Sequence, residues 1–497
     1  MDYAKNAVKR TALVFTISII AAFIGFLVRL VLARELSPED YGLLFSIFTL
    51  ITFLTLFRRV GLLQTIVKFI PEFQVKKKPD LIKNAIVIVL GINLILSIII
   101  SVILITSSNF LAKNYFRHPL AEPVLIIFSF IFIASVFKMT LRYIFNAFQK
   151  MDKFSLMYLA ENFLILLFIL LFFKLNIFNS PRVFLAAIAY LITYILLFFI
   201  FVPFFLKIYP FFKYKFKFSS KLSKKLIKFG ILVMISGIGN ITILYTDTLV
   251  LTYFSNLREV GIYNVLVPTA MLLDFFGRSV SQVIMPMVSE LWAKKLKEYV
   301  NKGVLLLQRY ALFAIIPLAT VMFSFPELLI KVLFGNEYIS GAFTLQLLVI
   351  GMIFFIIASI NMNILKAIGK PFAVSKVILT GALFNLITNF YFIPKYGIVG
   401  AGLTSLISYF LILLISIIYL KRSVKLKFPL YDWLKLFFSG VIMALLMIIL
   451  KAIIDINVYA EALVVCLLGG ATYLTLAIIT KAIDIETTKN FIKNIYK

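Results

Sequence analysis

Charged side chains interrupt several apolar stretches of this sequence that are long enough to cross a membrane. Arg58 and Arg59, for example, lie together in FLTLFRRVGLLQ at residues 53–64. A charge at bilayer depth costs about 3 kcal/mol of insertion free energy on translocon scales, so such residues mark functional sites by default. The ionisable residues within expected spans are Arg29, Arg58, Arg59, Lys68, Lys138, Arg142, Glu161, Asp247, Asp274, Arg278, Glu290, Arg309 and Lys451.

Some of these residues have a simple structural explanation. Lys68, Glu290 and Lys451 lie near span ends, where a long side chain reaches the interface while its stem stays in the apolar layer. We expect the same of Arg309. The others are deeper, and their cost has to be offset by a partner or a ligand.

Two of the deep arginines occupy similar positions in two long spans. Arg59 and Arg278 come eighteen and seventeen residues after the start of their spans, about 25–27 Å from the outer end at 1.5 Å per residue. Because neighbouring residues of a helix point about 100° apart, Arg58 and Arg59 cannot share one face. We expect one of them to face a cavity and the other the interface.

The remaining deep charges form sets with helical spacing. Asp274 precedes Arg278 by four residues, and Lys138 and Arg142 share a helix face opposite Glu161 on the next span. Either Arg142–Glu161 and Asp274–Arg278 are compensated pairs that only hold helices together, or they serve a ligand. Basic groups outnumber acids in this set, and an excess of buried positive charge requires an anion.

The sequence therefore predicts an anion site in a central cavity, with two carboxylates as candidates for coupling to protons or Na⁺. Asp247, in LYTDTLVL, lies toward the outer end of its span and is a candidate proton or cation site, as carboxylates in transport helices often are. We expect no metal site. The residues predicted to bind the anion are Arg29, Arg59, Lys138, Arg142, Asp274 and Arg278, and those predicted for coupling are Glu161 and Asp247.

Composition shows what must hold these charges in place. The 497 residues are 62% hydrophobic, with a mean hydropathy of +1.06, which a soluble domain cannot bury. Continuous apolar runs predict an all-α polytopic membrane protein. We expect fourteen spans, at residues 11–33, 41–70, 85–107, 121–147, 154–174, 183–206, 229–254, 261–291, 303–325, 342–365, 375–393, 398–420, 434–452 and 461–480.

The net charge of +29 is distributed unevenly over the connections. One alternate set, which includes both termini and the basic stretch 207–228, holds 33 of the 50 Lys and Arg residues, whereas the opposite set holds 8. Basic residues collect in cytoplasmic loops beside anionic lipid. We therefore expect both termini to be cytoplasmic, the stretch 207–228 to be an interfacial linker, and no nucleic acid to be bound.

An internal repeat divides the chain. With a shift of 219 residues, VLARELSPEDYGLLF at 31–45 aligns with VLTYFSNLREVGIYN at 250–264, so that Gly42 meets Gly261 and Arg59 meets Arg278. Six spans separate the copies, which gives them the same orientation. The predicted domains are two six-helix lobes at 1–206 and 229–420, the linker at 207–228, and two further helices with a tail at 421–497.

Three stretches resemble a known family. LARELSPEDYGLLFSI, FPELLIKVLFGNEYISGAFTLQLL at 325–348 and the segment 367–409, with its motif IPKYGIVGAG, are similar to polysaccharide and O-antigen flippases of the Wzx type, within the MATE/MOP superfamily. The resemblance covers essentially the whole chain. It implies a MATE/MOP fold and a lipid-linked oligosaccharide substrate, which would be moved between leaflets of the plasma membrane by alternating access.

Two other functions remain to be weighed. A MATE-type drug or cation antiporter would share the fold, but surplus deep positive charge repels a cationic substrate. The first-span aspartate of such exporters also has no counterpart here, since the first span offers only Arg29. An enzyme is not expected, because Walker A, D-x-D and H-E-x-x-H motifs are absent and the chain has one cysteine and one histidine. We expect no cofactor, membrane lipids as neighbours, and a monomer.

Overall fold

The computed structural model describes residues 2–175, 180–424, 430–454 and 457–482, and all regular elements within these ranges are helical. The chain divides into two compact units, Met1–Gly261 and Ile262–Lys497. Eleven helices of the described part are long and apolar enough to span a membrane, or twelve if the bent pair Ser220–Ile235 and Gly237–Phe254 is one span. The protein is therefore a multi-pass, all-α membrane protein, as the sequence predicts.

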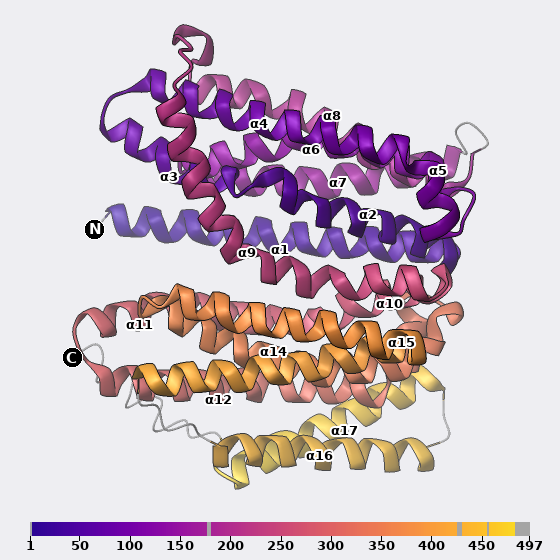
Figure 1. Ribbon diagram of the computed structural model, residues 1–497. Helices are drawn as coiled ribbons and strands as arrows, with labels where there is room; N and C mark the ends of the chain where they lie inside the picture. Colours follow the sequence, from indigo (N-terminus) through magenta and orange to yellow (C-terminus); the bar gives the residue numbers. More distant parts are fainter. Residues whose placement is uncertain (1, 176–179, 425–429, 455–456, 483–497) are drawn as a thin grey trace. The chain divides into compact units, whose positions relative to one another are not determined.

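The first unit contains the helices of the first expected lobe together with the next long helix (Figure 1). Its helices α4, α6 and α8 pack in sequence on one another, α7 packs against α1 and α8, and α9 packs against α2 and α3. The elements are α1 (Asp2–Glu35), α2 (Pro38–Arg59), α3 (Leu62–Val75), α4 (Pro79–Thr106), α5 (Ser108–Leu111), the π-helical turn η1 (Ala112–Phe116), α6 (Ala121–Ala147), α7 (Met151–Leu175), α8 (Arg182–Ile208), η3 (Phe211–Lys213) and α9 (Ser220–Phe254).

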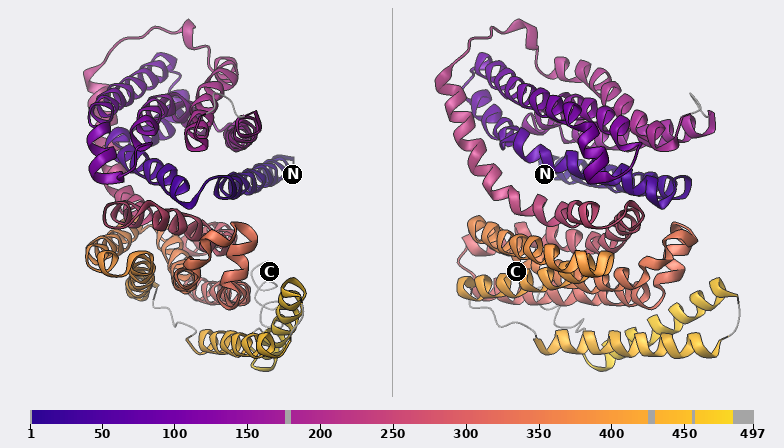
Figure 2. Two further views of the ribbon diagram at one scale, coloured as in Figure 1. Left: turned by 90° about the vertical axis from the view of Figure 1, so that its right-hand side faces the viewer. Right: turned by 45° about the vertical axis from the view of Figure 1, so that its right-hand side comes forward.

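The second unit begins within α10 (Leu257–Ala270). In it α14 packs along α15, α11 and α12, and the last two helices pack on each other and on α12 (Figure 2). Its other elements are η4 (Met271–Leu273), α11 (Asp274–Ala293), α12 (Lys297–Ser324), α13 (Pro326–Leu333), η5 (Asn336–Gly341), α14 (Ala342–Ala367), α15 (Pro371–Val424), α16 (Leu430–Ile453) and α17 (Val458–Ile479).

Two of the fourteen expected spans are broken helices. The span expected at 41–70 is divided between α2 and α3, because Val60 and Gly61 take left-handed backbone angles, with φ of 42° and 64°. The span expected at 261–291 is divided among α10, η4 and α11, just after Pro268, which lacks the N–H of a regular helix. Conversely, the two spans expected at 375–393 and 398–420 form α15, which bends sharply at Gly397 (φ 52°, ψ −131°).

Two features of the sequence explain local details of the helices. The Ser37 side chain caps α2 by accepting a hydrogen bond from the Asp40 N–H at 3.1 Å, and Pro38 occupies the first turn. Gly402 lets α15 approach α14, since a Cβ there would lie 3.1 Å from the Thr344 methyl group. These signals depend only on neighbouring residues, which is why the sequence shows them.

The repeat-related glycines meet in the first unit. A Cβ on Gly42 would lie 1.9 Å from the Leu257 carbonyl oxygen, and one on Gly261 would lie 1.9 Å from the Pro38 carbonyl oxygen. The first turns of α2 and α10 therefore cross backbone against backbone, with matched contacts in both directions. Equivalent residues of the two repeat copies contact each other, as residues beside a local two-fold axis do.

The lobe boundaries predicted at 206 and 229 stay a prediction. By its contacts α9 belongs with the first unit, since Gly230 lies against the bend between α2 and α3. A Cβ on Gly61 would come within 2.0 Å of the Gly230 carbonyl oxygen. Glycine at both positions is therefore required for this close crossing.

Candidate functional site

A buried ion pair lies at the centre of the charged residues of the first unit. The Lys138 ammonium of α6 donates a hydrogen bond to Glu161 Oε1 of α7 at 2.7 Å, and the two side chains are 2% and 13% exposed. The same ammonium lies 3.4 Å from the centroid of the Tyr194 ring on α8, a cation–π contact. Three helices thus converge on one positive charge.

The partner of Glu161 is not the arginine expected from the sequence. The carboxylate binds Lys138 and not Arg142, which lies one turn further along the same face of α6. The Arg142 guanidinium carbon instead lies 4.5 Å from the Phe154 ring centroid and 4.8 Å from that of Tyr158. Its Nε is buried without a hydrogen-bond partner among the described residues, and it forms none of their ion pairs. The Arg142 charge is therefore held by aromatic faces alone.

Arg58 is a candidate that the sequence did not single out for binding. Its side chain is 1% exposed, and Nη1 donates to the Phe132 carbonyl and to Ser135 Oγ, both at 2.6 Å. Its guanidinium also lies over the Phe132 ring at 4.5 Å. Phe132 and Ser135 precede Lys138 on α6, so Arg58 joins α2 to the helix that carries the ion pair. The side chain of Arg59, which was predicted to bind the anion, lies outside the described part.

Arg58 continues a stripe of buried side chains along α2. The buried side chains Leu44, Ile47, Ile51, Thr55 and Arg58 follow one another at spacings of three and four residues along α2. Because Arg59 also follows Thr55 at such a spacing, the pattern alone does not choose between the two arginines, and Arg58 is identified by its burial.

Arg29 of α1 lies against an aromatic ring of α2. Its guanidinium carbon is 4.7 Å from the Phe45 ring centroid. Arg29 and Glu161 both interact electrostatically with Tyr190 of α8. Tyr194, one turn further along α8, likewise interacts with both Glu161 and Arg58. The tyrosines of α8 thus connect charges from four other helices.

We refer to Arg29, Arg58, Lys138, Arg142 and Glu161 as the cationic cluster. It combines four cationic side chains with one carboxylate, so its formal charge is positive. In a low-dielectric environment a surplus of this kind is costly unless an anion or water compensates it. Tyrosine rings and a serine hydroxyl line the same region, and these groups can orient a polar anionic ligand.

The charges of the second unit form a smaller set. Asp274 and Arg278, one turn apart on α11, pair through Nε and Oδ2 at 2.6 Å, so the predicted pairing is confirmed. The carboxylate is 6% exposed, whereas the arginine side chain is 69% exposed. Asp274 therefore anchors an arginine whose other guanidinium nitrogens remain accessible to a ligand.

Asp247 lies on α9 of the first unit, between Thr246 and Thr248. Its side chain is 5% exposed. Among the described residues, no three His, Cys, Asp or Glu side chains come together as metal ligands. The role of Asp247 in proton or cation coupling stays a prediction.

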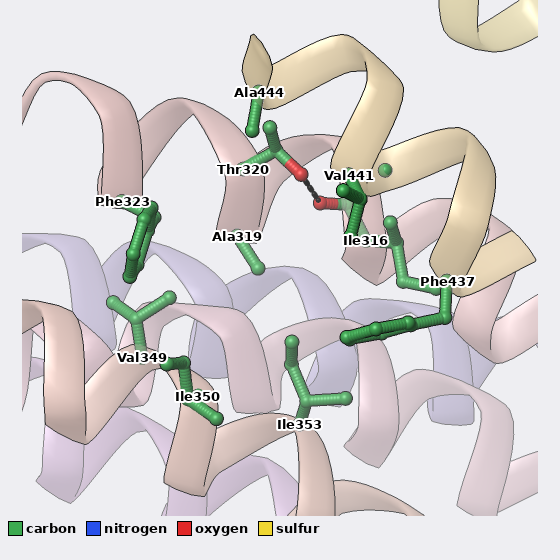
Figure 3. A pocket seen from close by; sticks show the side chains of 11 residues that line it. Ile316, Ala319, Thr320, Phe323, Val349, Ile350, Ile353, Phe437, Val441 and Ala444 are labelled. Atoms are coloured by element: carbon green, nitrogen blue, oxygen red, sulfur yellow. Dashed lines mark hydrogen bonds between the residues drawn. The ribbon is translucent and has the colours of Figure 1, made fainter.

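A pocket of about 160 Å³ lies between α12, α14 and α16 (Figure 3). The Thr320 hydroxyl is satisfied within its own helix by the Ile316 carbonyl at 2.9 Å, and the other lining groups are apolar. The pocket therefore does not suit a charged head group. Its walls include Ile316, Ala319, Phe323, Val349, Ile353, Phe437 and Ala444.

Arg309 does not snorkel as predicted. Its side chain is 13% exposed and donates hydrogen bonds to the carbonyls of Lys481 and Ala482, just beyond the end of α17. A cation near the last carbonyls of a helix also interacts favourably with the helix dipole. Tyr473 adds a second connection, because its hydroxyl donates to the Phe313 carbonyl of α12 at 3.2 Å.

An Arg309→Ala variant should loosen α17 from α12. Hydrogen bonds from a charged group contribute about 1.5–3 kcal/mol, so we expect a clear fall in unfolding temperature and faster proteolysis at the C-terminal end of α17. Thermal unfolding in detergent and limited proteolysis would measure both effects. Arg258→Ala, an exposed arginine on α10, is the control. Equal behaviour of the two variants would contradict a capping role.

Comparison with known sequences connects this arrangement to a family. Residues 7–292 match the family model described as "Polysaccharide biosynthesis protein". The chain belongs to this family. Relatives of the chain include an uncharacterised membrane protein of Methanocaldococcus jannaschii, 32% identical over the full length of both chains. A probable low-salt glycan biosynthesis flippase of Haloferax volcanii is 22% identical over 55% of this chain and 58% of its own.

Comparison with solved structures shows that this chain has the MATE/MOP fold. The lipid II flippase MurJ in an inward closed conformation matches 94% of this chain and 98% of its own, with a TM-score of 0.76 and 19% identity. An inward-facing MATE family multidrug transporter of the MOP superfamily matches 82% of this chain and 98% of its own, at a TM-score of 0.64 and 14% identity. The fold predicted from the resemblance is confirmed.

Proposed function

We propose that the protein is a flippase that moves a lipid-linked oligosaccharide, carried on a polyprenyl diphosphate, from the cytoplasmic to the outer leaflet. The family and the named function of the Haloferax relative support transport of a lipid-linked glycan. The single observation that carries the proposal is the cationic cluster, in which four cations and one carboxylate lie among the helices of the first unit, with Arg58 and Lys138 fully buried.

The chemistry of such a substrate matches the cluster. A diphosphate is polar and highly charged, so it cannot cross about 30 Å of hydrocarbon unaided. Arginine offers paired donors to phosphate oxygens, and lysine adds a compact positive charge. Arg29, Arg58, Lys138 and Arg142 would bind the diphosphate, and the tyrosines of α8 would contact the first sugar.

Binding would require Lys138 to exchange partners. The substrate phosphate competes with Glu161 for the ammonium, and Glu161 then becomes available to a proton or Na⁺. This exchange would couple loading of the substrate to an ion, with Asp247 as a second candidate for the same role. Arg59 and Arg278, at matched repeat positions, would bind the head group in other steps of an alternating-access cycle between the two expected lobes.

The alternative is a MATE-type multidrug or cation antiporter, which has the same fold. The cationic cluster disfavours it, because a site with this surplus repels a cationic drug.

We propose a transporter that is not an enzyme, requires no cofactor and works as a monomer in the plasma membrane with both termini in the cytoplasm. Its product would enter the assembly of surface polysaccharide or glycan.

Reconstitution in liposomes tests this proposal. Labelled polyprenyl-diphosphate oligosaccharide should become accessible at the opposite leaflet only with the protein present, and pH or Na⁺ gradients should change the rate if Glu161 or Asp247 couples ions. Charge reversal by Arg142→Glu or Arg278→Glu should abolish flipping, whereas Arg258→Glu should not. Normal flipping by both folded reversal variants, or transport of a cationic drug by the wild type, would overturn the proposal.

A further inference from the structure

The segment between α8 and α9, which we define as the strap (residues 209–218), consists of the short 3₁₀ turn η3 followed by extended chain. It is held on the first two turns of α4 by polar contacts. The Lys215 and Lys217 N–H groups donate to Asp80 Oδ1 at 3.1 Å and to Asn84 Oδ1 at 3.0 Å, and Lys83 Nζ donates to the Tyr214 carbonyl at 2.6 Å. Irregular backbone is stable where such partners satisfy it, so the strap has a defined register.

Aromatic rings hold the inner side of the strap. Tyr209 stacks on Tyr214 with ring centroids 5.1 Å apart, and its hydroxyl donates to the Pro79 carbonyl at 2.8 Å. Phe211 packs against Phe205 of α8, and Lys83 lies over its ring at 4.8 Å. The beginning of the strap is thus part of the folded unit and not a free loop.

The outer side of the strap combines two kinds of exposed side chain. Phe212, Phe216 and Phe218 are 80%, 47% and 64% exposed, which is unusual for aromatic residues in contact with water. Lys213, Lys215 and Lys217 alternate with them and are also exposed. In the extended part, residues 215–218, successive side chains point to opposite sides, so the exposed rings of Phe216 and Phe218 lie along one edge and the ammonium groups of Lys215 and Lys217 along the other.

Neighbouring segments extend the positive charge. The exposed lysines of the turn between α3 and α4 lie next to Pro79, and the start of α9 adds further exposed lysines. The nearby acids are engaged: Glu72 pairs with Lys76 at 2.6 Å and Lys225 at 3.6 Å, and Asp80 accepts from the strap. The hydrogen bond from Lys76 lowers the pKa of Glu72. The added lysines are Lys76, Lys77, Lys78, Lys221, Lys224, Lys225 and Lys228.

We propose that the strap binds the head groups of anionic phospholipids in the cytoplasmic leaflet. Rings at the interface fit between head groups and upper acyl chains, and lysines bind the lipid phosphates. A soluble anion would bind only the lysines. A lipid surface would bind the lysines through its phosphates and also accommodate the exposed rings, so it fits the strap better. The proposal concerns the lipid around the protein and does not depend on the transported substrate.

Native mass spectrometry of the purified full chain, with phosphatidylglycerol and phosphatidylcholine as probes, tests this binding. The variant Lys213→Gln/Lys215→Gln/Lys217→Gln should lose at least about ten-fold of its preference for phosphatidylglycerol. Phe212→Ser/Phe216→Ser/Phe218→Ser should weaken retention of the lipid further. The matched control is Lys113→Gln/Lys331→Gln/Lys395→Gln, three exposed lysines of the connections expected on the opposite side.

Both strap variants should keep the wild-type unfolding temperature, because the contacts with α4 are made by strap main-chain groups. Unchanged phosphatidylglycerol preference in the lysine variant would overturn the proposal, as would an equal loss in the control. Full competition by inorganic phosphate or by a short RNA would also overturn it, since the strap would then be a general anion site. The mass spectrometry measures lipid binding and not flipping, so its result is independent of the transport assay.

Discussion

A Lys138→Met variant is expected to lose flipping activity by about 100-fold, and a second substitution should restore its stability without restoring transport. Lys138→Met leaves the Glu161 carboxylate buried without its ammonium, which costs about 3–5 kcal/mol in comparable buried pairs. In Lys138→Met/Glu161→Gln neither charge remains, so we expect the unfolding temperature to return toward that of the wild type. The phosphate ligand would still be missing, and flipping should stay low.

Thermal unfolding and the liposome assay, applied to the single variants and the double variant, separate the two roles of Lys138. If the ion pair only holds α6 and α7 together, the double variant will recover transport together with stability. Recovery of transport would therefore contradict a role in binding the diphosphate. Lys376→Met, a lysine on α15 outside the cationic cluster, controls for the loss of one positive charge.

A Gly42→Ala or Gly261→Ala variant is expected to be severely destabilised. The added Cβ would lie 1.9 Å from a backbone oxygen in each case, and no side-chain rotation can relieve a clash with main chain. We expect a loss of at least about 4 kcal/mol, the range that marks exceptional mutations, and a strongly reduced yield of folded protein. Fluorescence size-exclusion chromatography and thermal unfolding would measure both.

Gly91→Ala on α4 is the matched control, because a Cβ at that position meets no atom within 4 Å. It should be neutral or slightly stabilising, since alanine is the better helix former. Wild-type stability of Gly42→Ala would show that α2 and α10 do not cross at the distance described, and the local two-fold relation would lose its support.

Much of the fold could be predicted from the sequence because the bilayer sets simple requirements. A span needs about 20 apolar residues with its backbone bonds satisfied internally, so composition alone locates most helices. The cap at Ser37, the bend at Gly397 and the matched glycines Gly42 and Gly261 are local or repeated signals. The breaks at Val60–Gly61 and Met271–Leu273 were missed, because apolar residues continue through both.

The candidate site was predicted in part. Four of its residues, Arg29, Lys138, Arg142 and Glu161, were identified as charges that a membrane helix carries only for a reason. Arg58 was left out because the choice between adjacent arginines depends on the rotation of α2 about its axis. That rotation is set by its packing against α6, where Phe132 and Ser135 accept the guanidinium.

The sequence by itself determined that this is an all-α, multi-pass membrane protein and that basic residues outnumber acids within its expected spans, since both follow from residue type and spacing. Only the tertiary structure decided that Glu161 pairs with Lys138 and that Arg309 caps the end of α17. The physical reason is that Lys138 and Arg142 lie on one helix face a single turn apart. Which of them meets a carboxylate depends on how far α7 is displaced along α6, and packing between whole helices sets that displacement.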